Sequence, residues 1–106
     1  MKRGDVVIVA PPGDTGKPRP ALVSHSDLFP ETAGVALAPF SSTILDSVLR
    51  LTIEPSAANG LRERSQVMTD RITTAHRSKV GQVIGRLEDG QVREVSVRLS
   101  LMLGLT

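Results

Sequence analysis

One arginine near the start of the sequence stands between two prolines, where a loop meets an apolar run. Arg19 follows Pro18 and precedes Pro20, and residues 21–23 are all apolar. Proline has a fixed φ and pushes the residue before it towards an extended backbone, so both prolines restrict Arg19. A guanidinium is planar, permanently charged and rich in donors, which suits it to gripping a phosphate. The same pattern also fits an ordinary solvated arginine in a strand–loop–strand unit.

The elements that would hold this arginine read as a series of short strands. Apolar or alternating runs predict strands that contain residues 6–9, 21–23, 34–38, 48–54, 65–69 and 80–84. Pro39 and Pro55 are expected to end the third and fourth of these strands, and residues 26–33 to form a loop. A polar group comes just after the third strand: Ser41, Ser42 and Thr43.

The apolar period becomes helical near the end of the chain. Asp89 is the expected N-cap of this helix, and Gly104 is placed to end it. Asn59 and Gly60 predict a turn, and Gly81 and Gly85 are expected at the ends of the last strand or at a bulge. The pattern therefore predicts a mainly β chain with a C-terminal helix (α+β). We expect a single domain over residues 1–106, built as a small antiparallel barrel or strongly curved sheet.

Composition excludes several classes of function. The 106 residues include no cysteine, which rules out thiol catalysis, cysteine metal sites and disulfides. No apolar stretch approaches the ~20 residues of a membrane helix, and the N-terminus does not resemble a signal peptide. We therefore expect a soluble protein of the cytoplasm that does not associate with a membrane.

The balance of charged residues points weakly towards phosphates. There are 13 Lys and Arg against 11 Asp and Glu, and ten of the 13 are arginine. This preference for arginine favours recognition of phosphate or carboxylate groups. The cations also cluster, at Arg62 with Arg64 and at Arg71 with Arg77 and Lys79. Only 2% of the residues are aromatic, so few side chains are available to recognise bases by stacking.

Several blocks of the sequence together resemble the MazF/PemK family of toxin endoribonucleases. The most specific are Gly4-Asp5 near the start and Arg19-Pro20 followed by Val23. The matching blocks stand in the order of the family and extend over nearly the whole chain: residues 2–7, 16–23, 37–42, 66–72, 83–87 and 103–105.

The resemblance implies an SH3-like antiparallel barrel of the CcdB/PemK type with a C-terminal helix. It implies a homodimer that cleaves single-stranded RNA with no metal ion or other cofactor. In this chemistry the ribose 2′-hydroxyl attacks the adjacent phosphate and leaves a 2′,3′-cyclic phosphate and a 5′-hydroxyl. The resemblance further implies a cognate antitoxin that blocks the RNA groove.

The roles of the catalytic residues follow from the resemblance position by position. Arg19 matches the catalytic arginine, to which we assign stabilisation of the charge on the phosphate. Ser41 stands where the family has a threonine; the hydroxyl is kept, but Ser42 or Thr43 could serve instead. Asp70 matches an acidic position that is present in some members and is proposed there as a base or as an RNA contact.

The base that takes the 2′-hydroxyl proton is left open between Asp70 and His25. An unbulged strand would put His25 on the same face as Arg19 but ~20 Å away, so a plain polar role fits it better. The loops at 14–18 and 26–31 are expected to set the RNA sequence that is cut. The remaining candidate RNA contacts are Lys17, Ser42, Thr43, His25, Arg71 and Arg77.

Two other functions are compatible with the sequence. Some toxins with the same barrel inhibit a topoisomerase by binding to it, and such a protein would not need Arg19. A catalytically inactive relative that only binds RNA would keep the fold. The retained Arg19-Pro20 block and the nearby hydroxyls argue against the topoisomerase-directed function.

Overall fold

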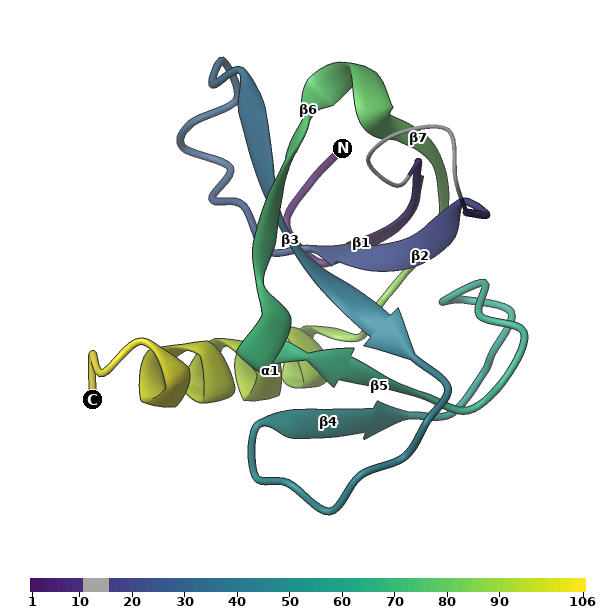
Figure 1. Cartoon of the computed structure of the whole chain (residues 1–106), viewed down its shortest axis with the longest axis vertical. Coiled ribbons are helices and arrows are strands. Elements are labelled where there is room, and N and C mark those ends of the chain that lie inside the picture. Colours follow the sequence, from purple (N-terminus) through teal and green to yellow (C-terminus); the bar gives the residue numbers. More distant parts are fainter. Residues whose placement is uncertain (11–15) are drawn as a thin grey trace.

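The computed structural model describes residues 1–10 and 16–106 of the chain (Figure 1). Most of the Pro/Gly-rich loop before Arg19, at residues 11–15, lies outside the described part, and so does the start of the predicted recognition loop at 14–18. The strands are β1 (Asp5–Val9), β2 (Arg19–Val23), β3 (Gly34–Ser41), β4 (Arg50–Ile53), β5 (Ser65–Met68), β6 (Thr73–His76) and β7 (Val80–Arg86). The helical elements are the single-turn η1 (Thr69–Arg71) and η2 (Arg77–Lys79) and the α-helix α1 (Asp89–Met102).

The strands form one antiparallel sheet of seven strands in the order β4-β5-β3-β2-β1-β7, with β6 paired to β3. The eight-residue β3 crosses the centre of the molecule, and α1 lies on the side of β4 and β5 (Figure 1). The predicted class, mainly β with one C-terminal helix, is confirmed. The sheet is open rather than closed into a complete barrel.

The long β3 corrects the expectation that Pro39 ends the third strand. Pro39 pairs with Ala21 of β2, and the strand then continues through Phe40 and Ser41, which pair with β5. Proline lacks an N–H and is tolerated where a strand does not need that donor. Pro39 sits where β3 leaves one neighbouring strand for another.

Other boundaries also differ from the expected ones. The fourth strand is shorter than predicted, because it contains only residues 50–53. The strand β6 was not predicted, since its residues 73–76 are mostly polar and show no apolar alternation. The N-cap of α1 is Glu88 rather than Asp89, because the Glu88 side chain and Gln91 form a reciprocal capping box. Gly104 has a φ of 72° just after the helix, as predicted.

Two apolar clusters explain why the first strands are continuously apolar. Val6 and Leu22 belong to a cluster that also contains Val95 and Leu99 of α1. Val7 and its neighbours on the same face belong to a second cluster formed by Ala21, Val23, Val35 and Leu37. Both faces of β1 and β2 are therefore buried, which is the condition under which strands lose the alternation of apolar and polar residues.

Candidate functional site

A groove of about 520 Å³ lies beside the first residue of β2. We call it the Arg19 groove. It is formed by the start of β2, the end of β3, the middle of β7 and the segment before β5. Its lining residues are Ile8, Pro18, Arg19, Pro20, Phe40, Ser42, Gly60, Leu61, Arg62, Glu63, Ser65, Gln82 and Ile84.

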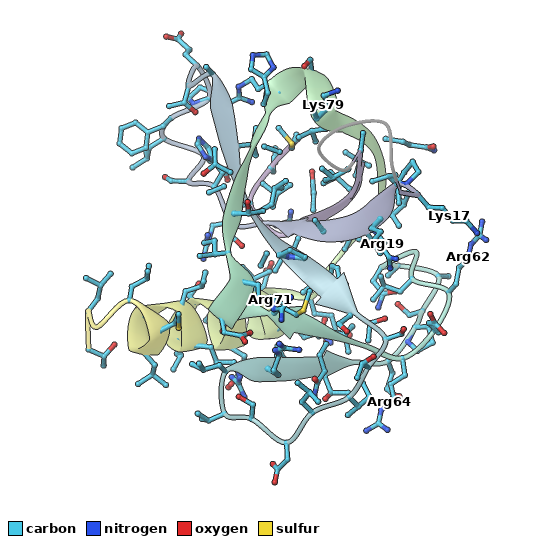
Figure 2. The ribbon with its side chains drawn as sticks, viewed as in Figure 1. Lys17, Arg19, Arg62, Arg64, Arg71 and Lys79 are labelled. Carbon is cyan, nitrogen blue, oxygen red and sulfur yellow. The ribbon has the colours of Figure 1, made fainter. Side chains whose placement is uncertain are left out.

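Arg19 is held by its backbone while its side chain stays exposed. It pairs with Val9 of β1 at the last rung of that ladder, and Pro18 and Pro20 lie beside it in the wall of the groove. Its guanidinium makes no hydrogen bond or ion pair with residues 1–10 or 16–106. Figure 2 shows it on the same side of the molecule as Lys17 and Arg62. A charged guanidinium at the edge of a groove, with no partner in the described part of the chain, can accept an anionic ligand.

The segment between β4 and β5 is fixed by Asn59 and Gly60. The side-chain oxygen of Asn59 accepts hydrogen bonds from the N–H groups of Ser56 and Leu61, both at 3.0 Å. Gly60 has a φ of 71°, and a Cβ there would lie 2.2 Å from the carbonyl oxygen of Ile84. This close approach to β7 requires glycine.

Two buried residues hold the part of this segment that faces the groove. Leu61 is 8% exposed and belongs to the core, and Ser65 is 5% exposed. The Ser65 hydroxyl donates to the backbone oxygen of Glu63 at 2.9 Å. The exposed side chains of Arg62 and Glu63 are therefore presented from a short segment anchored at both ends.

The three predicted hydroxyls do not lie in equivalent places. Ser41 Oγ accepts a hydrogen bond from the N–H of Thr43 at 3.1 Å, so it stabilises the turn that follows β3. Ser42 is exposed and lines the Arg19 groove, whereas neither Ser41 nor Thr43 is among the lining residues. The structure thus brings Ser42 to Arg19.

Asp70 is bound by a buried arginine. Its carboxylate accepts two hydrogen bonds from Arg50, at 2.7 Å from Nε and 3.1 Å from Nη2. The Arg50 side chain is only 6% exposed, against 31% for that of Asp70. The hydrogen bonds from Arg50 hold the pKa of Asp70 below its ordinary value of 3.8. A carboxylate held in this way is a weak proton acceptor, and neither Asp70 nor the adjacent Arg71 lines the Arg19 groove.

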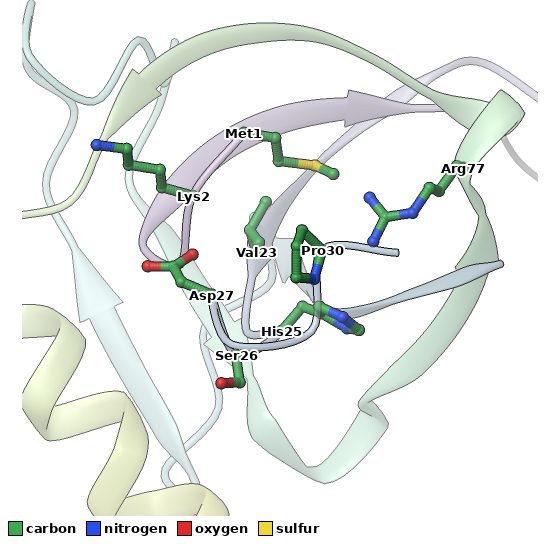
Figure 3. A pocket seen from close by; sticks show the side chains of 8 residues that line it. All are labelled: Met1, Lys2, Val23, His25, Ser26, Asp27, Pro30 and Arg77. Carbon is green, nitrogen blue, oxygen red and sulfur yellow. The ribbon is translucent and has the colours of Figure 1, made fainter. Parts of the chain in front are cut away.

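His25 and Arg77 lie in a different hollow, next to the N-terminus (Figure 3). The Nδ1 atom of His25 accepts a hydrogen bond from the N–H of Ala36 at 3.2 Å, and Nε2 lies 2.7 Å from the carbonyl oxygen of Phe29. The ring therefore fastens the loop between β2 and β3. Arg77 donates from Nε to the carbonyl oxygen of Thr32 at 2.5 Å and so holds the other side of that loop.

The groove also contains residues that the sequence patterns do not assign to a site. Arg62 stands out in the sequence only as part of a basic cluster, and Glu63 stands in no motif. Gln82 gives a faint signal, because it is a polar residue inside a predicted apolar strand.

Among the described residues, no group of three or more His, Cys, Asp or Glu side chains could hold a metal ion. No helix in the described part is long and apolar enough to span a membrane.

Comparison with known proteins assigns the chain to a family over nearly its whole length. Residues 2–103 match the family model described as PemK-like, MazF-like toxin of type II toxin–antitoxin systems. A protein named probable endoribonuclease MazF, from Mycolicibacterium smegmatis, is 39% identical over 107 residues, which cover 99% of this chain and 98% of that protein.

Solved structures share the fold at lower identity. The Mycobacterium tuberculosis toxin MazF-mt6 superposes with a TM-score of 0.82 at 23% identity, covering 96% of this chain and 98% of that one. A mycobacterial endoribonuclease in complex with its cognate antitoxin gives a TM-score of 0.83 at 20% identity, covering 100% of this chain and 97% of that one.

Proposed function

The chain belongs to the PemK-like, MazF-like family of type II toxins, and we propose that it is an endoribonuclease that cleaves single-stranded RNA in the Arg19 groove. The observation that carries this proposal is the position of Arg19. Its guanidinium is exposed, lines a groove and has no partner among the described residues. The groove also contains the hydroxyl of Ser42 and the side-chain amide of Gln82, and this combination suits a phosphate with its flanking nucleotides.

Arg19 would act on charge that develops during the reaction. Attack by the 2′-hydroxyl on the adjacent phosphorus adds negative charge to the nonbridging oxygens. A guanidinium can donate to two of these oxygens at once, and a preorganised donor of this kind is worth ~3 kcal/mol of barrier. We assign Arg19 this role rather than proton transfer, because arginine hardly gives up its proton.

The hydroxyl that orients the phosphate is Ser42 in this proposal. Ser42 lines the groove with Arg19, whereas the Ser41 hydroxyl already bonds to the backbone of Thr43. Gln82 lines the same groove and has both a donor and an acceptor for a base edge. Single-stranded RNA fits this chemistry better than duplex, since a stacked A-form helix keeps the 2′-hydroxyl out of line with the bond that breaks.

The partners of the chain are part of the same proposal. We expect a homodimer in the cytoplasm that is inhibited by a cognate antitoxin. The mycobacterial endoribonuclease of similar fold was solved in complex with its cognate antitoxin, which supports a partner of this kind. The Arg19 groove also carries Arg62, and Lys17 lies on the same side of the molecule (Figure 2). An acidic, disordered antitoxin segment that folds onto this basic surface would exclude RNA.

The experiment is cleavage of a long single-stranded RNA by the purified protein in the presence of EDTA. We expect cutting that persists with the chelator, 2′,3′-cyclic phosphate and 5′-hydroxyl ends, and no cutting of the same sequence as a duplex. Arg19→Ala is the inactive control. Complete loss of cutting on chelation would refute the mechanism. A protein that arrests growth equally well with Arg19→Ala would instead be acting by protein contact.

A further inference from the structure

The Arg19 groove has a single carboxylate among its described lining residues, that of Glu63. Neither predicted base lies there: Asp70 is bound by Arg50, and His25 lines the hollow near the N-terminus. We propose that Glu63 is the general base that takes the proton from the ribose 2′-hydroxyl. This inference rests on the proposed endoribonuclease function.

The surroundings of Glu63 keep its carboxylate available. Its neighbour Arg64 forms an exposed ion pair with Glu54 at 3.0 Å, so that cation is directed to another partner. Glu63 itself forms no ion pair with any residue of the described ranges. Its backbone is fixed by the Ser65 hydroxyl and by the buried Leu61, which precedes it by two positions. A base on an anchored segment loses little entropy when the substrate binds.

The negative charge of Glu63 is unfavourable for RNA binding, because it repels the phosphates that the groove is proposed to bind. Arg19 and Arg62 line the same groove and offset its charge. If Glu63 only filled space, its removal would strengthen RNA binding and leave the rate of cleavage unchanged. If it is the base, removal strengthens binding but slows the chemical step. The two roles therefore predict different rates of cleavage for the same variant.

The proposed step conserves atoms and electrons. The 2′-O–H bond breaks, its proton moves to the Glu63 carboxylate, and the 2′-oxygen bonds to phosphorus. The bond between phosphorus and the 5′-oxygen then breaks, and that oxygen takes a proton from water. Glu63 returns its proton to water. No oxidant, reductant or further co-reactant takes part, and the products are the cyclic phosphate and the 5′-hydroxyl.

The test compares Glu63→Gln, Glu63→Asp and the wild type on a short RNA that contains a site cut by the wild type in long RNA. Asp46→Asn is the control, because Asp46 is an exposed carboxylate outside the groove lining and forms no ion pair with a described residue. We expect Glu63→Gln to lower kcat about a hundredfold, the usual contribution of a general base, while KM stays equal or falls. Glu63→Asp should restore part of the rate, and the control should match the wild type.

Two further measurements separate base catalysis from a structural role. The rise of kcat with pH that a titrating base produces should disappear in Glu63→Gln. On a substrate in which sulfur replaces the 5′-oxygen, the leaving group departs without a proton. The Glu63→Gln defect should persist there, whereas a defect in protonation of the leaving group would vanish.

The outcomes distinguish this inference from the proposed function. A wild type that cuts no RNA refutes both. A wild type that cuts while Glu63→Gln keeps its kcat within threefold refutes only the assignment of the base, and so does an unchanged pH profile or relief by the sulfur substrate. Far-UV circular dichroism checks that each variant is folded, which the exposed position of Glu63 leads us to expect.

Discussion

Replacement of Asp70 by asparagine should damage the stability of the protein and spare its catalysis. The Asp70 carboxylate makes two charge-assisted hydrogen bonds to Arg50, whose side chain is 6% exposed. Asparagine keeps the shape but has no charge and a single acceptor oxygen. Breaking a buried ion pair from one side costs about 3–5 kcal/mol. Because the Asp70 side chain is 31% exposed, water replaces part of what is lost, and we expect a smaller cost of about 2–3 kcal/mol.

This loss is large enough to measure by thermal or urea unfolding. For a domain of this size it corresponds to a fall in Tm of roughly 10–20 °C. The chain has no Trp or Tyr, so unfolding should be followed by far-UV circular dichroism, with concentration taken from peptide-bond absorbance. The control is Glu54→Gln, which breaks an ion pair with both side chains more than half exposed and should change stability by less than about 1 kcal/mol.

The pH dependence of the Asp70→Asn effect follows from the direction of the pKa shift. Arg50 lowers the pKa of Asp70 in the folded protein, so the folded state favours the ionised carboxylate. The stabilisation is therefore complete above the ordinary carboxyl pKa and is lost as the pH falls through the lowered one. The difference between wild type and variant should be constant near neutral pH and shrink only below about pH 4.

Catalysis decides whether this assignment of Asp70 is correct. At a temperature where both proteins are folded, Asp70→Asn should keep kcat within about threefold of the wild type, because Asp70 does not line the Arg19 groove. A variant that is as stable as the wild type but has lost kcat a hundredfold would show that Asp70 acts on the substrate. That result would overturn both the structural role of Asp70 and the assignment of the base to Glu63.

Three further predictions concern the groove and the assembly. Arg19→Lys should lower the cleavage rate about a hundredfold or more without changing the fold, because an ammonium cannot make the two-pronged phosphate contact; near-normal kinetics would show that charge alone suffices. Gly60→Ala should cost about 2 kcal/mol or more in urea unfolding, since a side chain there is strained at positive φ and meets the Ile84 carbonyl; unchanged stability would contradict the close approach to β7. Light scattering should find a dimer, and a monomer at roughly tens of micromolar would contradict the proposed assembly.

The local features of the fold could be predicted from the sequence. Continuous apolar runs predicted β1, β2 and most of β3, because both faces of these strands are buried. Helical spacing and Gly104 located α1 and its end, since caps and periodicity depend on nearby residues. Arg19 was singled out by its flanking prolines, because they restrict its backbone conformation independently of the rest of the fold. The predicted end of β3 at Pro39 was wrong, because whether a strand can contain a proline depends on which strands pair with it there.

The composition of the candidate site was decided by tertiary structure. Gln82 lines the groove with Arg19 because β1 pairs with both β2 and β7. Glu63 joins them because the segment before β5 packs against β7, where Gly60 meets the backbone of Ile84. The family resemblance made Asp70 one candidate for the base, and only the fold brings the buried Arg50 to its carboxylate. Sequence patterns indicate which residues form strands and which residues are charged. Which acidic residue is paired and which lines the groove depends on contacts between residues far apart in the chain, and these exist only once the sheet has formed.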